Sequence, residues 1–133
     1  MHETNAWIEY LCGKDAMFIA RVNARPTVDL ALSTIVLGEL LYGAYHSGPG
    51  NVAKRLLQVE RLRKTFENVP FDMNSAEEYG KLRDYLARQG LLIGSYDMLI
   101  AATAVANGLT LVTHNTAEFG RVPGLAIEDW QSP

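Results

Sequence analysis

The sequence has one cysteine, no excess of basic residues and no long apolar run, and each shortage excludes a class of protein. The single cysteine, Cys12, cannot form an internal disulfide, so we expect a small core or helix-end residue without a redox role. No apolar run approaches the length that crosses a bilayer, and no basic segment followed by an apolar one opens the chain. These features predict a cytoplasmic protein without a membrane partner.

The charge balance and the short motifs exclude further kinds of site. A formal net charge of −3, from 12 basic and 15 acidic residues, does not indicate a nucleic-acid binder. Four of the acids could instead gather around a metal ion: Glu3, Glu39, Asp97 and Glu118. The eleven other acids would then face twelve bases, and the acidic excess would be a pocket. No glycine-rich phosphate loop, nucleophile elbow or zinc-ligand spacing occurs.

The length and the patterning predict one α/β domain over residues 1–133. With 133 residues, of which 48% are apolar, the chain is large enough for a core. Helical and β-type runs alternate with few hairpin signals, which indicates a parallel sheet. We expect helices over residues 6–11, 16–23, 35–46, 52–66 and 74–89, a buried helix after Ser95, and short strands at 29–32, 69–71, 109–112 and 125–130. Thr4 or Asn5 is the expected N-cap of the first helix, and Asn74 or Ser75 that of the helix ending at 89.

The stretch from Gly94 to Phe119 organises the rest of the chain. Ser95 is a plausible helix N-cap, which places Asp97 in the first turn, and the residues that follow are apolar on nearly all sides. Gly108 is expected at the end of this helix in the left-handed conformation. The next strand ends in polar residues. Because working groups in parallel α/β sheets lie beyond the carboxyl ends of the strands, Asp97 and Asn115 could meet at one edge.

Five stretches of the sequence carry a family resemblance. They are ETNAWIEYL and STIVLGELLYGA in the first half, and IGSYDMLIAA, LVTHNTAEFGRVPGL and EDW in the second. In this order and at this spacing they resemble the blocks of PIN-domain ribonucleases of the VapC toxin type. The resemblance implies a three-layer α/β/α fold around a short, mainly parallel central sheet. Met1-His2 is shorter than the strand that opens the family's fold, so we expect a truncated first strand.

The resemblance implies hydrolysis of RNA phosphodiesters by water on Mg²⁺ or Mn²⁺, which prefer oxygen ligands. Asp97 matches the family's metal-binding Asp. It could instead be an ordinary helix-terminal carboxylate, stabilised by about 0.3–1 kcal/mol. Glu39 matches the family's acidic residue in the ELLYGA block, and it could instead be a solvated helix residue. The sequence around both positions favours metal binding.

Glu3 departs from the family pattern, which has Asp at this position. The extra methylene moves the carboxylate by about 1.5 Å on a fixed backbone, and a misplacement of about 1 Å can cost on the order of a hundredfold in rate. Glu3 could bind metal bidentately or through water, or it could be a frayed residue near a helix start. Two functions therefore stay open: an endoribonuclease toxin, or a catalytically impaired PIN domain that binds antitoxin or RNA. A receiver-like signalling domain is a poorer third, because no Lys follows Lys81.

Several other residues are candidates for supporting roles. Asn115 stands where many PIN domains carry a fourth Asp; it could bind metal or hold a water, or be a turn residue, but it cannot act as a base. Glu118 could supply the missing charge or be solvent-exposed. Thr113 could hydrogen-bond the ligands, and Thr4 and Asn5 could orient them or cap a helix. The resemblance also implies an RNA substrate, a homodimer and a VapB-like antitoxin lying over the acidic groove.

Overall fold

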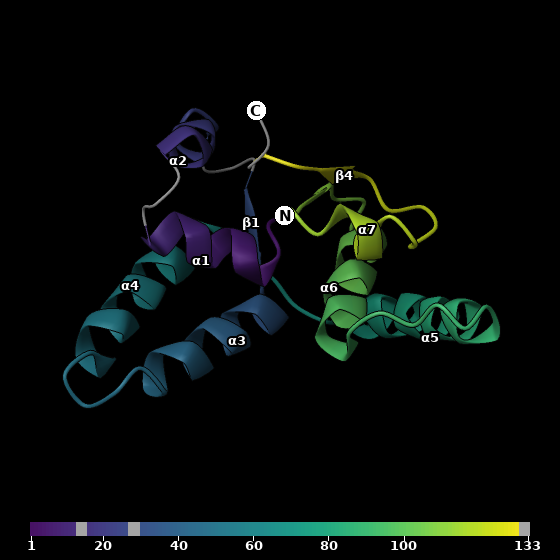
Figure 1. The fold of residues 1–133 in the computed structure, drawn as a ribbon, viewed down its shortest axis with the longest axis horizontal. Helices are drawn as coiled ribbons and strands as arrows, with labels where there is room; N and C mark the ends of the chain where they lie inside the picture. Colours follow the sequence, from purple (N-terminus) through teal and green to yellow (C-terminus); the bar gives the residue numbers. More distant parts are fainter. Residues whose placement is uncertain (13–15, 27–29, 131–133) are drawn as a thin grey trace.

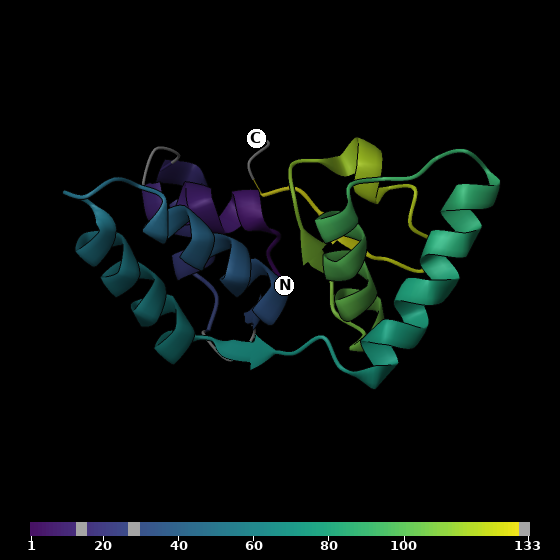
Figure 2. The same cartoon turned by 90° about the horizontal axis from the view of Figure 1, so that it is seen from below.

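The fold places short parallel strands between two groups of helices (Figure 1). A computed structural model describes residues 1–12, 16–26 and 30–130. The helices are α1 (Thr4–Cys12), α2 (Ala16–Asn23), α3 (Thr34–Tyr45), α4 (Val52–Thr65), α5 (Met73–Arg88), α6 (Ser95–Ala106) and α7 (Thr116–Phe119). The strands are β1 (Ala31–Ser33), β2 (Glu67–Val69), β3 (Leu111–Val112) and β4 (Ile127–Glu128). In Figures 1 and 2, α1 to α4 lie on one side and α5 and α6 on the other.

All strand pairings among the described residues are parallel, which confirms the predicted fold class. β1 pairs with β2, and β3 pairs with β4. His2 forms a parallel bridge with Val112, so the expected first strand is present as a single bridge. The strands are shorter than predicted, because a residue belongs to a strand only where it pairs with a neighbouring strand. β3 contains two of the four residues of LTLV. Of the strand predicted at 29–32, Asp29 lies outside the described residues.

The short N-terminal segment is firmly held against β3. The Met1 ammonium group donates to the Thr110 carbonyl at 2.6 Å. The Val112 amide donates to the Met1 carbonyl at 2.6 Å, and the Glu3 amide donates to the Val112 carbonyl at 3.0 Å. Each of these bonds fixes one backbone group of the segment, so the residue that carries the first acidic side chain has a defined position.

The core surrounds this segment and α6. Its largest fully buried side chains include Trp7, Phe18, Leu32 and Ile100. As predicted, α6 is buried on several sides, and its C-cap, Asn107, is followed by Gly108 in the left-handed region at φ 63°. None of the described helices combines the length and the apolar character needed to cross a bilayer.

The predicted N-caps of α6 and α5 are wrong. The N-cap of α6 is Gly94, and Ser95 is already the first helical residue. The N-cap of α5 is Asp72, whose Oδ1 accepts from the Ser75 amide at 2.9 Å. At the start of each of these helices, more than one residue is a suitable N-cap. The path of the chain before the helix determines which of them keeps a non-helical backbone and becomes the N-cap.

Candidate active site

Residues far apart in the sequence line one cleft of about 830 Å³ between α1, α3 and the start of α6. The cleft receives Glu3, Glu39 and Asp97, together with Thr4 and Asn5. In Figure 2 the N-terminus lies between α3 and α6, the two helices that line the cleft with it. Its remaining lining residues are Ile8, Thr34, Ile35, Gly38, Tyr42, Gly43 and Tyr96.

Glu3 caps helix α1 with its own carboxylate. Its Oε2 accepts from the Asn5 amide and its Oε1 from the Ala6 amide, each at 3.0 Å, and the residue is 3% exposed. The expectation that Thr4 or Asn5 would cap this helix is therefore wrong, because the longer Glu side chain already satisfies both amides. The alternative of a frayed residue is also wrong. Burial raises the pKa of the Glu3 carboxyl, the two amides oppose this rise, and the nearby Asp97 and Glu39 add to it.

Thr4 joins the start of α1 to α3. Its hydroxyl donates to Oε1 of Glu39 at 2.6 Å. Because Glu3 accepts the first amides of α1, the Thr4 hydroxyl is available to hold the Glu39 carboxylate. Asn5 lines the same cleft with an exposed side chain.

Asp97 meets a second carboxyl group, that of Glu118. Burial is the main cause that raises the pKa of Asp97, followed by the charges of Glu118 and Glu39 and a hydrogen bond with Glu118. Glu118 is half-buried and accepts from the Asn115 side-chain amide at 3.2 Å. The Asn115 backbone amide donates in turn to the hydroxyl of buried Thr113 at 2.9 Å. The Glu118 carboxylate thus links Asn115 to Asp97.

Gly94 gives the Asp97 carboxylate its room. A Cβ at position 94 would lie 3.3 Å from Oδ2 of Asp97. The carboxylate therefore turns back over the first turn of α6, where the amide groups of the helix terminus favour a negative charge.

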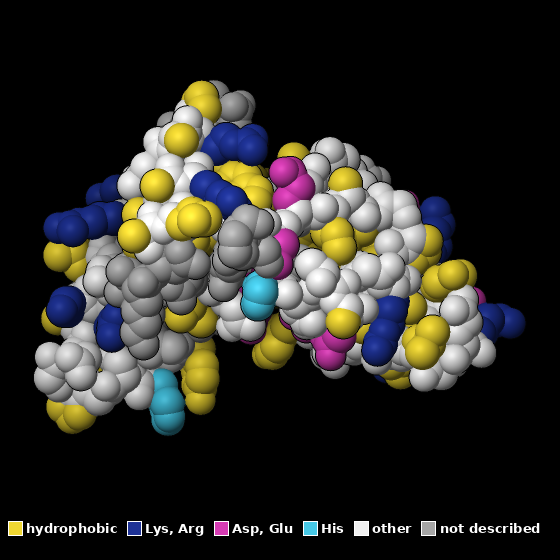
Figure 3. Space-filling model, turned by 45° about the horizontal axis from the view of Figure 1, so that its top comes forward, with side chains coloured by type: hydrophobic (Ala, Val, Ile, Leu, Met, Phe, Trp, Pro, Cys, Tyr) yellow, Lys and Arg dark blue, Asp and Glu magenta, His cyan; other side chains and the backbone are white. Residues whose placement is uncertain are grey.

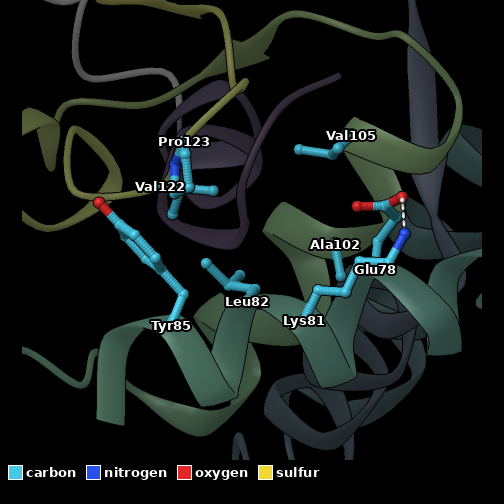
Figure 4. A pocket seen from close by; sticks show the side chains of 8 residues that line it. All are labelled: Glu78, Lys81, Leu82, Tyr85, Ala102, Val105, Val122 and Pro123. Carbon is cyan, nitrogen blue, oxygen red and sulfur yellow. Dashed lines mark ion pairs between the residues drawn. The ribbon is translucent and has the colours of Figure 1, made fainter. Parts of the chain in front are cut away.

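The cleft has negative charge without a basic side chain to neutralise it. None of the described residues that line it is Lys or Arg. Figure 3 shows Lys and Arg side chains in several separate places on the face that it presents. A second hollow, of about 330 Å³, lies between α5 and α6 and is largely apolar (Figure 4). The one lysine among its described lining residues, Lys81, forms an ion pair with Glu78 at 3.7 Å. The cleft beside α1 therefore gathers carboxylates without a basic lining residue, whereas Arg55 lines the adjoining hollow that Glu39 also reaches.

The donor set of the cleft suits Mg²⁺ or Mn²⁺. It offers carboxylate, hydroxyl and amide oxygens, which hard cations prefer. Across the residues that the structure describes, no three His, Cys, Asp or Glu side chains converge closely enough to hold an ion together. An ion bound here would therefore need hydroxyl, amide or water oxygens beside the carboxylates.

The fold corresponds to a known class. The sequence matches the PIN domain family over residues 1–125. The chain therefore belongs to the PIN-domain family.

Relatives within this family narrow the class. The chain is 38% identical over 130 residues to a tRNA(fMet)-specific endonuclease VapC from Salmonella typhimurium, covering 98% of this chain and 96% of that one. DNA-bound VapBC from Salmonella typhimurium has a TM-score of 0.90 at 36% identity, over 98% of this chain and 96% of that chain. VapBC2 from Rickettsia felis, bound to a promoter DNA fragment, has a TM-score of 0.87 at 32% identity, over 98% and 97%. Within the family the chain is a VapC-type endoribonuclease of the toxin–antitoxin class, and such nucleases depend on a divalent cation.

Sequence reasoning missed two aromatic residues of the cleft. Tyr42 and Tyr96 line it beside the acidic residues. The available signal was their spacing: Tyr42 is one helical turn after Glu39, and Tyr96 directly precedes Asp97.

Proposed function

We propose that this endoribonuclease hydrolyses RNA phosphodiesters in the cleft, with Mg²⁺ or Mn²⁺ held by Glu39 and Asp97 and by Glu3 through a water molecule. One observation carries the proposal: carboxylates from the residue before α1 and from α3 and α6 share a cleft in which no described lining residue is basic. Both carboxylate oxygens of Glu3 already accept backbone amides, which favours indirect binding at this position.

The side chains around the carboxylates have distinct roles in this proposal. When bound, the ion lowers the pKa of a water molecule and offsets charge on the phosphate in the transition state. Thr4 orients Glu39 through the 2.6 Å hydrogen bond. Asn115 donates to Glu118 and thereby holds this second carboxylate beside Asp97. Thr113 fixes the turn that carries Asn115, and Asn5 contributes a polar group at the edge.

We further propose an RNA substrate and two protein partners. The relative from Salmonella typhimurium is named for tRNA(fMet), so initiator tRNA is the first RNA to test. The neighbouring structures contain VapB proteins, which supports a VapB-like antitoxin as partner here. An antitoxin Arg entering the cleft would form charge-assisted hydrogen bonds with its carboxylates. A homodimer that acts in the cytoplasm completes the proposal.

Cleavage of an RNA panel that includes initiator tRNA tests the proposal, in Mg²⁺, Mn²⁺ and EDTA. We expect cleavage by the chain and by its Glu3→Asp variant, inhibition of both by EDTA, and a loss of about a hundredfold or more in Glu39→Gln. Glu77→Gln, at an exposed acid of α5, is the control for the loss of a negative charge. The second candidate, an impaired binding module, is favoured if neither the chain nor Glu3→Asp cleaves any RNA while a VapB-like antitoxin still binds.

A further inference from the structure

Two tyrosine rings stand beside the carboxylates of the cleft with most of their surface in solvent. Tyr42 is 67% exposed and Tyr96 is 62% exposed, and both line the cleft. Neither hydroxyl bonds to another residue in the described part of the chain. Tyr42 follows Glu39 by one turn of α3, and Tyr96 precedes Asp97 in the first turn of α6. Most of the surface of these two side chains therefore lies outside the packing of the fold.

Tyr42 has a second ring beside it. His46 stacks on Tyr42 with the ring centroids 5.4 Å apart and an angle of 13° between the ring planes. This stack covers part of one face of the Tyr42 ring, and the rest of the exposed ring remains as a flat surface beside the cleft. A flat, partly polar surface of this kind suits a planar ligand.

The charges of the cleft indicate which planar ligand fits. A cleft without Lys or Arg among its described lining residues offers phosphate groups no basic side chain of its own, and Arg55 lines only the hollow that adjoins it at Glu39. A nucleic-acid strand that enters must gain affinity from another source. Stacking of bases on aromatic rings supplies such affinity for every base, because every base has a π-face.

We propose that Tyr42 and Tyr96 each stack an unpaired RNA base beside the acidic residues of the cleft. This inference rests on the proposed function, since it assigns two binding residues to the same site. The two rings come from different elements, α3 and α6, and accept bases only from a strand whose bases are unstacked. Base-paired RNA therefore binds poorly, and the position of the two rings selects a single-stranded or loop segment.

Binding of a short RNA strand that contains 2-aminopurine tests the two rings. The fluorescence of this base falls when it stacks, and a labelled end gives Kd by anisotropy. The full-length chain is used in Ca²⁺, after the RNA is shown to stay intact there. We expect Kd to rise roughly 5- to 150-fold in Tyr42→Leu and in Tyr96→Leu, with a loss of the 2-aminopurine quenching. The corresponding Phe variants keep the ring, so their Kd stays within about twofold.

Tyr45→Leu is the matched control. Tyr45 lies on the same helix as Tyr42 and is 65% exposed, but it is not among the residues that line the cleft. In cleavage assays the two Leu variants of the cleft raise KM more than they lower kcat.

Three outcomes overturn the proposal. Unchanged Kd in both Leu variants, with cleavage by the intact chain preserved, overturns the role of the rings alone. Unchanged Kd together with a change in oligomeric mass or antitoxin affinity assigns the rings to a protein contact instead. An intact chain that neither binds nor cleaves RNA overturns the proposed function as well.

Discussion

The hydrogen bond between Thr4 and Glu39 gives a sharp test of how the cleft is assembled. Replacing Thr4 by Val removes the hydroxyl and keeps the shape of the side chain. The bond is 2.6 Å long and its acceptor is a carboxylate. Hydrogen bonds to charged groups contribute about 1.5–3 kcal/mol, and the open cleft reduces this to about 1 kcal/mol. For a chain of this length that corresponds to a decrease in Tm of roughly 3–6 °C.

The effect on the ion is expected to be larger than the effect on stability. Without the hydroxyl, Glu39 samples several rotamers and must be ordered when the ion binds. Loss of such an orienting group typically costs on the order of 10–100-fold in metal affinity or activity. We expect the Mn²⁺ concentration that gives half-maximal cleavage to rise by about that factor in Thr4→Val, and calorimetric Mn²⁺ binding to weaken in parallel.

Thr4→Ser is the control, because it keeps the hydroxyl and loses only a methyl group. Its dependence on Mn²⁺ stays close to that of the parent chain. The reasoning is refuted if Thr4→Val loses stability as expected while its Mn²⁺ dependence is unchanged. In that case Glu39 would not be a ligand, and its bond to Thr4 would serve only to join α1 to α3.

Three further predictions concern His2, two glycines and Asp97. Both ring nitrogens of buried His2 lack a hydrogen-bond partner among the described residues, so His2→Leu raises the free energy of unfolding in urea by about 1–3 kcal/mol. Burial is the main cause that lowers the pKa of His2 to about 3. As pH falls below 6.5, the unfolded chain therefore binds a proton at His2 and the folded chain does not, which destabilises the parent chain. The stability that His2→Leu gains is therefore larger at pH 5 than at pH 8 by about 2 kcal/mol. A Cβ at Gly80 in α5 or at Gly38 in α3 would meet no atom within 4 Å. Alanine at either position is therefore expected to raise the free energy of unfolding by about 0.5–1 kcal/mol. Only Gly38→Ala is expected to slow RNA cleavage, because it adds a methyl group in the cleft. We expect Asp97→Asn to abolish cleavage. Because the pKa of Asp97 is raised, the Tm of the parent chain in EDTA decreases relative to that of this variant as pH rises from 3.8 through the folded-state pKa. A large loss of Tm in the variant at pH 7 would contradict a shared acidic site.

The sequence predicted most helices because their buried faces repeat along the chain. The helix after Gly94 is apolar on nearly all sides, and the structure buries it accordingly. The resemblance of five stretches located the acids of the cleft, since their order and spacing are those of a family. Strand ends were predicted less well, because pairing with another strand defines them, and local composition does not contain that information.

The contacts among polar side chains could not be predicted from the sequence. Glu is not a preferred N-cap, so capping preference pointed to Thr4 or Asn5 and away from Glu3. The bond between Asn115 and Glu118 and the closeness of Glu118 to Asp97 depend on how the turn after β3 meets the start of α6. Such contacts join segments whose relative positions only the folded chain defines.

The capping contacts of Glu3 bear directly on whether the longer side chain impairs the enzyme. An Asp before α1 would cap the helix by accepting from the same second and third amides that Glu3 now uses at 3.0 Å. These amides, more than the side-chain length, fix where the carboxylate oxygens lie, and the extra methylene is taken up between them and the backbone. We therefore expect Glu3→Asp to change the cleavage rate by less than about tenfold, well below the hundredfold that a free displacement of about 1 Å would cost. An increase of a hundredfold or more in Glu3→Asp would show that the amides do not fix the carboxylate, and that Glu3 limits the activity of this chain.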